Sequence, residues 1–155
     1  MLAEKIGSTA PQNWQEICEP IQPFLDEVSE QLEQAINSFD PQIATFVQYA
    51  LGSRGKQLRP GLVALSARAS GGINAHHVNA AVIIEMVHLA TLVHDDVVDG
   101  AEVRRNRPTL AANWGNKVAV LAGDCLFAEA LRLAATLPTT EVCELVSQSA
   151  KVVCT

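Results

Sequence analysis

Three carboxylates lie within five residues near the middle of the chain, in the run Asp95-Asp96-Val97-Val98-Asp99. On a helix that turns about 100° per residue, Asp95, Asp99 and Asp96 lie near 0°, 40° and 100°, on one face. Such close carboxylates repel one another, so the cluster is stable only in water or with bound cations. Mg²⁺ typically uses one or two carboxylates, several waters and the phosphates of a substrate. The spacing therefore predicts a metal-bridged diphosphate site, and an ordinary solvated helix end is the alternative.

The residues before this cluster extend the same face. Residues 82–93 are mostly apolar, with Glu85, His88 and Thr91 as the exceptions, so the acids end a helix that is buried on most sides. His88 falls near 20° on the acid face, about 10 Å further down the axis. A lone histidine on an apolar helix is more often a hydrogen-bonded core residue than a ligand contact. With the acids above it, we weigh the two interpretations equally.

Two short cationic segments complement the acids. Lys56 and Arg59, in Gly55-Lys56-Gln57-Leu58-Arg59-Pro60, are three residues apart at a helix entrance, where backbone N–H groups favour anions. Alone, this pair would usually be ordinary surface charge in a loop. A second group, Arg104, Arg105 and Arg107, follows the acids directly. A diphosphate requires both signs of charge: metal held by acids on one side, and Arg and Lys for the remaining oxygens.

Length and composition limit the classes of protein to consider. The chain of 155 residues is 48% hydrophobic, which predicts one domain with a substantial core. A net charge of −6 without a basic stripe argues against nucleic acid as a partner. The four cysteines (Cys18, Cys125, Cys143 and Cys154) include no C-x-x-C pair, which favours reduced thiols. No signal peptide or transmembrane segment is recognisable, so we expect a soluble cytoplasmic protein.

Helical periodicity dominates the chain, and no strand alternation is convincing. The predicted helices span residues 24–39, 43–51, 60 to about 70, 74 to about 99, 117–135 and 142–153. Pro60 suits a first helical turn, and Asn74 is a candidate cap for the long central helix. Thr139 or Thr140 can cap the last helix. Residues 100–116 read as a loop or a broken helix. The fold class is therefore all-α.

Three ordered motifs carry a resemblance to a known family. The strings GKQLRP, HLATLVHDDVVDGAEVRRNRPT and GDCLFAEAL resemble the N-terminal half of a trans-isoprenyl diphosphate synthase, of the polyprenyl synthetase family. The similarity covers roughly Leu51 to Leu131. It implies an antiparallel helix bundle of the isoprenoid synthase type, here incomplete. Residues 1–155 would form the N-terminal portion of a single such domain, without the C-terminal helices that carry the second Asp-rich motif.

The resemblance also implies roles for individual residues. Asp95, Asp96 and Asp99 match the family's first aspartate-rich motif, catalytic residues that bind Mg²⁺, or Mn²⁺ in its place, bridged to the allylic diphosphate. Arg104 assists on that side. The positions that hold the diphosphate of isopentenyl diphosphate are matched by Lys56, Arg59, His88 and Arg105. Asn106 departs from the family's usual glycine, which puts the local loop geometry in doubt. Asp124 matches another family position, to which we assign either a structural role or a supporting role behind the ligand-binding residues.

The activity that this resemblance implies is prenyl transfer. An allylic diphosphate would ionise and condense with isopentenyl diphosphate, giving a trans-polyprenyl diphosphate longer by five carbons. The growing tail should pass Thr91, Val87 and Ile84, near −40°, −80° and −20° on the acid face. In the family, bulky aromatics four or five residues before the first Asp shorten the product. Here these positions are Thr91 and Ala90, so we expect products longer than C15, although helical geometry places Ala90 off that face.

The family's second aspartate-rich motif is absent, since only Glu129, Glu141 and Glu144 follow Asp124 as acidic residues. We therefore expect about half of an enzyme, inactive alone, whose exposed apolar faces favour a homodimer or other self-association. One alternative is a noncatalytic regulatory or truncated subunit that binds metal-diphosphate or a partner helix bundle. A class I terpene cyclase ranks lower, because it does not need the second cradle at Lys56 and Arg59.

Overall fold

The computed structural model describes residues 13–52 and 55–153, and these are almost entirely helical. The elements in chain order are α1 (Trp14–Cys18), the 3₁₀ helix η1 (Glu19–Ile21), α2 (Gln22–Asn37), α3 (Pro41–Leu51), α4 (Leu58–Ala69), α5 (Ala75–Val98), β1 (Val103–Arg104), β2 (Arg107–Pro108), α6 (Leu110–Trp114), α7 (Asn116–Ala134) and α8 (Glu141–Val153). The predicted all-α class is confirmed.

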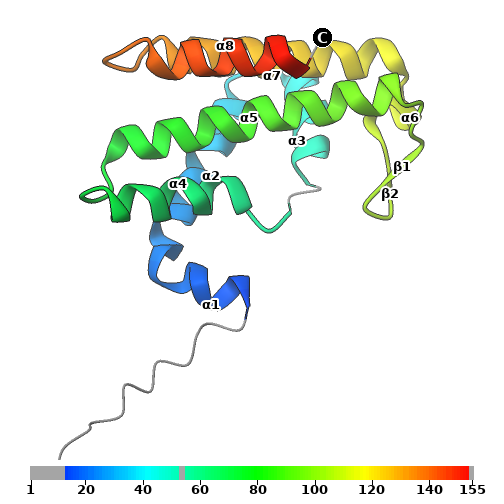
Figure 1. Cartoon of the computed structure of the whole chain (residues 1–155). Helices are drawn as coiled ribbons and strands as arrows, with labels where there is room; N and C mark the ends of the chain where they lie inside the picture. Colours follow the sequence, from blue (N-terminus) through cyan, green and yellow to red (C-terminus); the bar gives the residue numbers. More distant parts are fainter. Residues whose placement is uncertain (1–12, 53–54, 154–155) are drawn as a thin grey trace, which may run out of the picture.

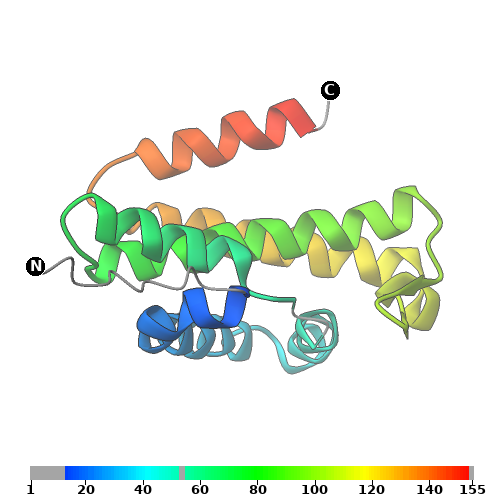
Figure 2. The same cartoon turned by 60° about the horizontal axis from the view of Figure 1, so that its bottom comes forward.

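The central helix is α5, and the other long helices pack around it. Its most extensive contacts are with α7 and α4, which run antiparallel to it (Figure 1). The side chain of Asn74 accepts hydrogen bonds from the backbone N–H groups of His76 and His77, and the ring of His77 accepts one from the N–H of Asn74. This reciprocal capping box begins the helix at the predicted residue. Figure 2 shows α8 on the opposite side of α5 from α1 and α2.

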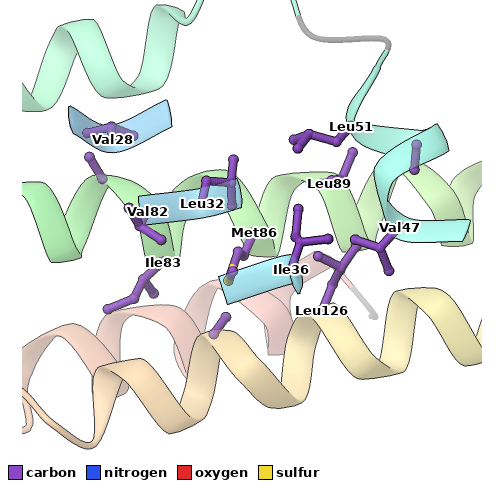
Figure 3. Packing of buried hydrophobic residues seen from close by; sticks show 14 of the residues in the cluster. Val28, Leu32, Ile36, Val47, Leu51, Val82, Ile83, Met86, Leu89 and Leu126 are labelled. Atoms are coloured by element: carbon purple, nitrogen blue, oxygen red, sulfur yellow. The ribbon is translucent and has the colours of Figure 1, made fainter. Parts of the chain in front are cut away.

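A continuous apolar core fixes the rotation of α5 about its axis. The α2 residues Val28, Leu32 and Ile36 follow one another at intervals of four and are buried. They face a set of buried residues drawn in Figure 3: Val82, Ile83, Met86 and Leu89 of α5, Val47 and Leu51 of α3, and Leu126 of α7. Burying one such side chain contributes about 1.5–3 kcal/mol. The polar residues at the C-terminal end of α5 are thereby held in a defined direction.

The segment predicted as a loop or broken helix contains a short β-hairpin followed by α6. Val103 pairs with Pro108, and Arg104 with Arg107, in antiparallel register. Arg105 and Asn106 between them have φ values of 50° and 62°, as in a two-residue type I′ turn. The strands have two residues each, which is too short for alternation to be visible in the sequence. The helices α1 and η1, with five and three residues, are likewise too short for helical periodicity to predict them.

The remaining helix boundaries lie within two residues of those predicted. For α8, the carbonyl of Thr140 accepts a hydrogen bond from the N–H of Glu144 at 2.9 Å, and its hydroxyl donates to the Glu144 carboxylate at 2.7 Å. Cys18, Cys125 and Cys143 are free thiols, as predicted, and Cys154 lies outside the described residues. Within residues 13–52 and 55–153, no helix combines the length and apolarity that crossing a membrane requires.

Candidate functional site

The three acids at the end of α5 are in two different environments. Asp95 and Asp99 are exposed and lie one turn apart, with the N–H of Asp99 donating to the Asp95 carbonyl at 2.8 Å. Asp96 is only 6% exposed. From the sequence we expect the acid cluster to be in water or to hold cations, and Asp96 departs from this because it is buried. Its position about 100° further round the helix directs it toward the hairpin, which folds back and covers it.

Asp96 is held by the hairpin through Arg104. The Nε of Arg104 donates to Oδ1 of Asp96 at 2.7 Å, and the backbone N–H of Ala101 donates to the Asp96 carbonyl at 2.9 Å. The hydroxyl of Thr109 donates to the carbonyl of Ala101 at 2.7 Å. A buried carboxylate is costly unless it is paired, and Arg104 provides the pairing. Arg104 thus lies on the acid side, as predicted, with its Nε occupied by Asp96.

The two exposed acids, Asp95 and Asp99, suit a metal ion whose remaining coordination positions are filled by a bound ligand. Among the described residues, no three His, Cys, Asp or Glu side chains converge into a ready set of metal ligands. Asp95 and Asp99 nevertheless present two solvent-facing carboxylates on adjacent turns. Mg²⁺ is commonly held by one or two carboxylates, with water and substrate phosphates filling its octahedron. The donor set therefore fits Mg²⁺ shared with a diphosphate.

A cationic cleft lies beside α5, and it gathers the four residues predicted to hold a second diphosphate. Lys56 and Arg59 come from the start of α4, His88 from α5 and Arg105 from the hairpin turn. The complete lining is Leu51, Gly55, Lys56, Gln57, Leu58, Arg59, Glu85, His88, Leu89, Leu92 and Arg105. Segments separated by up to about fifty residues thus converge as the sequence predicted.

The electrostatics of the cleft are visible in the pKa of His88. Burial, followed by the nearby charges of Arg59, Arg105 and Arg104, lowers this pKa from 6.5 to about 4, while the charge of Asp95 opposes the shift. The imidazole is therefore neutral at pH 7 and can donate one hydrogen bond and accept another. Because both the arginines and Asp95 act on this pKa, His88 lies between the cationic cleft and the acidic tip of α5.

Two glycines allow the hairpin arginines to approach the loop before α4. A Cβ on Gly52 would lie 2.9 Å from Nη1 of Arg107, and a Cβ on Gly55 would lie 2.9 Å from Nη1 and Nη2 of Arg105. Gly52 has an ordinary helical φ of −61°, so close packing rather than backbone conformation explains this glycine. The hairpin and the loop are therefore packed directly against each other.

Tyr49 of α3 anchors the hairpin from its other side. Its hydroxyl donates to the carbonyl of Pro108 at 2.8 Å, and the guanidinium of Arg107 lies over its ring, 4.6 Å from the centroid. The ring of Trp114 meets Tyr49 edge-on at 4.7 Å between centroids. Arg107 is therefore occupied in anchoring the hairpin, while Arg105 reaches the cleft.

An apolar groove continues from the cationic cleft between α5 and α8. Ile84, Val87 and Thr91, the residues predicted to contact a growing tail, line one wall. The other wall is formed by the α8 residues Val142, Leu145, Val146, Ser149, Ala150 and Val153. Arg59 and His88 line both the cleft and the groove, which joins the two spaces. Ala90 is 1% exposed in the core, off this face as helical geometry indicated.

His94 connects the acidic tip of α5 to α7. Its Nε2 lies 3.3 Å from Oδ1 of Asp124 and 3.3 Å from the carbonyl of Val120. The ring lies against Gly123, where a Cβ would collide with it. Asp124 thus makes a polar contact between α7 and α5, with its side chain 65% exposed.

Sequence reasoning did not identify three residues around the cleft. Glu85 lines it, and the signal was available, because a charge inside the apolar run 82–93 needs an explanation. Tyr49 supports the hairpin, and Trp14 donates a hydrogen bond to the carbonyl of Lys56. Both act through contacts more than forty residues away in the chain, for which the sequence contains no local signal.

Most of the chain is similar to a known protein family. The family model described as Polyprenyl synthetase matches residues 40–155. A prenyl transferase from Synechocystis sp. is 39% identical over 132 residues, covering 83% of this chain and 41% of the relative. Solanesyl-diphosphate synthase 2 from Oryza sativa subsp. japonica is 36% identical over 157 residues, covering 97% of this chain and 38% of the relative. The chain thus spans about two fifths of the length of these relatives.

Solved structures also match most of this chain over less than half of their own length. A decaprenyl diphosphate synthase from Rhodobacter capsulatus superposes with a TM-score of 0.85 at 33% identity, covering 90% of this chain and 43% of that one. A polyprenyl synthase from Caulobacter crescentus CB15, complexed with calcium and isoprenyl diphosphate, gives the same TM-score at 29% identity. The helices of this chain are therefore arranged as in part of an isoprenoid synthase bundle.

Proposed function

We propose that this chain, which belongs to the polyprenyl synthetase family, forms the substrate-binding portion of a trans-prenyltransferase. The reaction would condense an allylic diphosphate with isopentenyl diphosphate. One observation carries the proposal: Arg59 and His88 line both the cationic cleft and the apolar groove. Condensation of isopentenyl diphosphate with an allylic substrate needs a charged pocket for the first beside an apolar channel for the isoprenoid tail of the second.

The cationic cleft is the proposed site for isopentenyl diphosphate. Lys56, Arg59 and Arg105 would bind its phosphate oxygens through charge-assisted hydrogen bonds, which are stronger than neutral ones. Neutral His88 would add a further hydrogen bond without another full charge. A class I terpene cyclase binds one diphosphate and would have no use for this second cationic cleft, so the cleft favours the transferase.

The tip of α5 is the proposed site for the allylic diphosphate. Asp95 and Asp99 would hold Mg²⁺, or Mn²⁺ in its place, together with waters and diphosphate oxygens. When bound there, the metal would stabilise negative charge on the leaving diphosphate. Asp96 would act through Arg104, whose position it fixes. The chain's residues would thus bind and orient both substrates, while the new carbon–carbon bond forms between the substrates themselves.

The groove between α5 and α8 is the proposed path of the isoprenoid tail. Ile84, Val87 and Thr91 leave it open on the α5 side, and no aromatic residue is among its lining residues. We therefore propose a product longer than C15. The named relatives, such as the solanesyl and decaprenyl diphosphate synthases, make long-chain products according to their names.

Exposed apolar side chains favour self-association of the chain. Leu121 on α7 is 50% exposed, which suits burial against a second copy or against further helices of the bundle. Light scattering coupled to size-exclusion chromatography would measure the assembly.

Because Cys18, Cys125 and Cys143 are free thiols, we place the protein in a reducing compartment such as the cytosol.

Binding experiments test the function without requiring turnover. Isothermal titration of the 155-residue chain with isopentenyl diphosphate should show binding that Lys56→Ala and Arg59→Ala each weaken. Binding of farnesyl diphosphate should require Mg²⁺ and be lost in Asp95→Ala. If neither ligand binds, or these variants bind as the parent does, the proposed function is wrong.

A noncatalytic binding module is the second candidate, since the chain spans only about two fifths of its enzyme relatives. Incubation with Mg²⁺, labelled isopentenyl diphosphate and several allylic starters separates the two. We expect binding with little or no elongation for this chain alone. Elongation on adding the remaining helices of the bundle would establish the transferase, whereas continued inactivity with intact binding would support the module.

A further inference from the structure

Trp14 in α1 contacts the loop that carries Lys56, although 42 residues separate the two. Its indole Nε1 donates to the carbonyl oxygen of Lys56 at 2.7 Å. Its ring lies on Gly61 of α4, where a Cβ would lie 2.5 Å from Cζ2 and 2.9 Å from Cη2. Gly61 is buried and has no positive φ, so the approach of the indole explains why this position is a glycine.

The carbonyl that Trp14 binds controls an unusual backbone conformation. It belongs to the peptide plane between Lys56 and Gln57, and Gln57 has φ 49° and ψ 40°, in the left-handed region. Residues with a Cβ are disfavoured there, so surrounding contacts must hold the conformation. Rotation of this peptide plane would change the φ of Gln57 directly. The Trp14 hydrogen bond opposes that rotation.

A second hydrogen bond holds the same residue from α2. The side-chain Nε2 of Gln57 donates to Oγ of Ser29 at 2.8 Å. The carbonyl of Gln57 accepts from the N–H of Gly61 at 3.0 Å, which closes the first turn of α4. Lys56 and Arg59 lie on either side of this held residue. Their relative directions in the cleft therefore depend on its conformation.

We infer that Trp14 is a positioning residue for the cationic cleft: through the Lys56 carbonyl and Gly61, it holds the left-handed turn that directs Lys56 and Arg59 toward a bound diphosphate. This inference rests on the proposed function. Trp14 lies outside residues 40–155, the part that the family model matches. The N-terminal helix of this chain is thus part of its diphosphate site.

The test measures inorganic pyrophosphate binding to the 155-residue chain by isothermal titration. Trp14→Phe keeps an aromatic ring over Gly61 and removes the N–H donor. Losing one hydrogen bond should weaken pyrophosphate binding about three- to tenfold, with the melting temperature nearly unchanged. Gly61→Ala keeps Trp14, forces its ring away and favours the helix, so it should weaken binding similarly even if Trp14→Phe folds poorly.

Matched variants separate this inference from the proposed function. Lys56→Ala and Arg59→Ala should weaken pyrophosphate binding, and parent protein that binds no pyrophosphate would overturn both proposals. Gln34→Ala removes an exposed hydrogen bond to Glu30 elsewhere in the N-terminal segment and should bind as the parent does. If Lys56 and Arg59 matter but Trp14→Phe and Gly61→Ala bind normally, the inference about Trp14 is wrong and the proposed function stands.

The fluorescence of Trp14 provides a second measurement, because its emission would not respond to pyrophosphate if Trp14 only stabilised the fold. The chain contains two tryptophans, so a Trp114→Phe background leaves Trp14 as the sole tryptophan, which excitation at the red edge of the absorption band selects over the one tyrosine. Pyrophosphate should shift the Trp14 emission with the same midpoint as the heat signal. Saturating pyrophosphate without any shift would show that the indole is not linked to the occupied cleft, and would overturn the inference.

Discussion

Asp96 and Arg104 form a hydrogen-bonded ion pair, with 2.7 Å between Oδ1 and Nε, under the β-hairpin that follows α5. The Asp96 side chain is 8% exposed and the Arg104 side chain 34%. Asp95 and Asp99, by contrast, face solvent. The acidic motif therefore combines two carboxylates available to a metal with one that fixes an arginine. Stability and metal-dependent binding should separate when these residues are substituted.

We expect Asp96→Asn to lower the free energy of unfolding by about 1–3 kcal/mol, because it removes the charged partner of a hydrogen bond in a mostly buried place. Asp95→Asn should change that free energy by no more than about 0.5 kcal/mol, as exposed substitutions usually do, yet abolish Mg²⁺-dependent binding of farnesyl diphosphate. Urea unfolding followed by circular dichroism gives the first quantity and titration calorimetry the second. Equal loss of stability in both variants would contradict the division of roles.

The turn of the hairpin requires a residue that tolerates positive φ at Asn106, where φ is 62°. Asparagine is among the few residues that adopt this region readily. Asn106→Gly should therefore leave stability and binding nearly unchanged. Asn106→Val should lower the free energy of unfolding by about 1–2 kcal/mol, since a β-branched side chain is strained there. Urea unfolding of both variants tests this, and equal stability would rule out a type I′ turn.

Local signals explain why α5 could be predicted so closely from the sequence. Asn74 offers a cap, residues 82–93 are nearly all apolar, and Gly100 follows Asp99, so every feature that begins or ends this helix lies in adjacent residues. The cationic cleft was also predictable in outline. Lys56 and Arg59 lie at the start of one helix and Arg105 follows another. They could be grouped from the sequence because a diphosphate requires several positive charges.

The environment of Asp96 could not be predicted in the same way. On a helical wheel it lies only about 100° from Asp95, and its burial depends on a hairpin whose strands are two residues long. The contacts of Trp14 with Lys56 and of Tyr49 with Pro108 span 42 and 59 residues. Such pairs depend on how whole helices pack, and neither spacing nor composition encodes them locally.

His88 should make the fold sensitive to mild acid. Its pKa is about 4 in the folded protein and 6.5 ordinarily, so the unfolded chain binds the proton more readily. Stability from neutral His88 is therefore fully present above pH 6.5 and is lost as the pH falls toward 4. We expect His88→Gln to flatten the decline in unfolding free energy across this window. Urea unfolding at several pH values measures it, and parallel pH curves for variant and parent would contradict the prediction.

A diphosphate in the cleft should raise the pKa of His88. Arg59, Arg105 and Arg104 lower this pKa, and bound phosphate would offset their charge, adding to the effect of Asp95. The protein should therefore take up protons on binding pyrophosphate near pH 5.5. Calorimetry in two buffers of different ionisation enthalpy measures this uptake. His88→Gln provides the baseline for protonation of the ligand itself, and an uptake identical in both proteins would exclude His88 as the acceptor.

Thr91 should govern how much of an isoprenoid tail the groove accepts. It lines the groove between α5 and α8, so Thr91→Phe would place an aromatic ring in the path of the tail. Each buried methylene contributes about 0.8 kcal/mol, and displacing two would weaken geranylgeranyl diphosphate binding about tenfold while pyrophosphate binding stays unchanged. Ala90→Phe is the contrast: Ala90 is 1% exposed in the core, so overpacking should lower stability without selecting between ligands. Calorimetric affinities for both ligands decide, because a tail that avoids the groove would bind Thr91→Phe and the parent equally well.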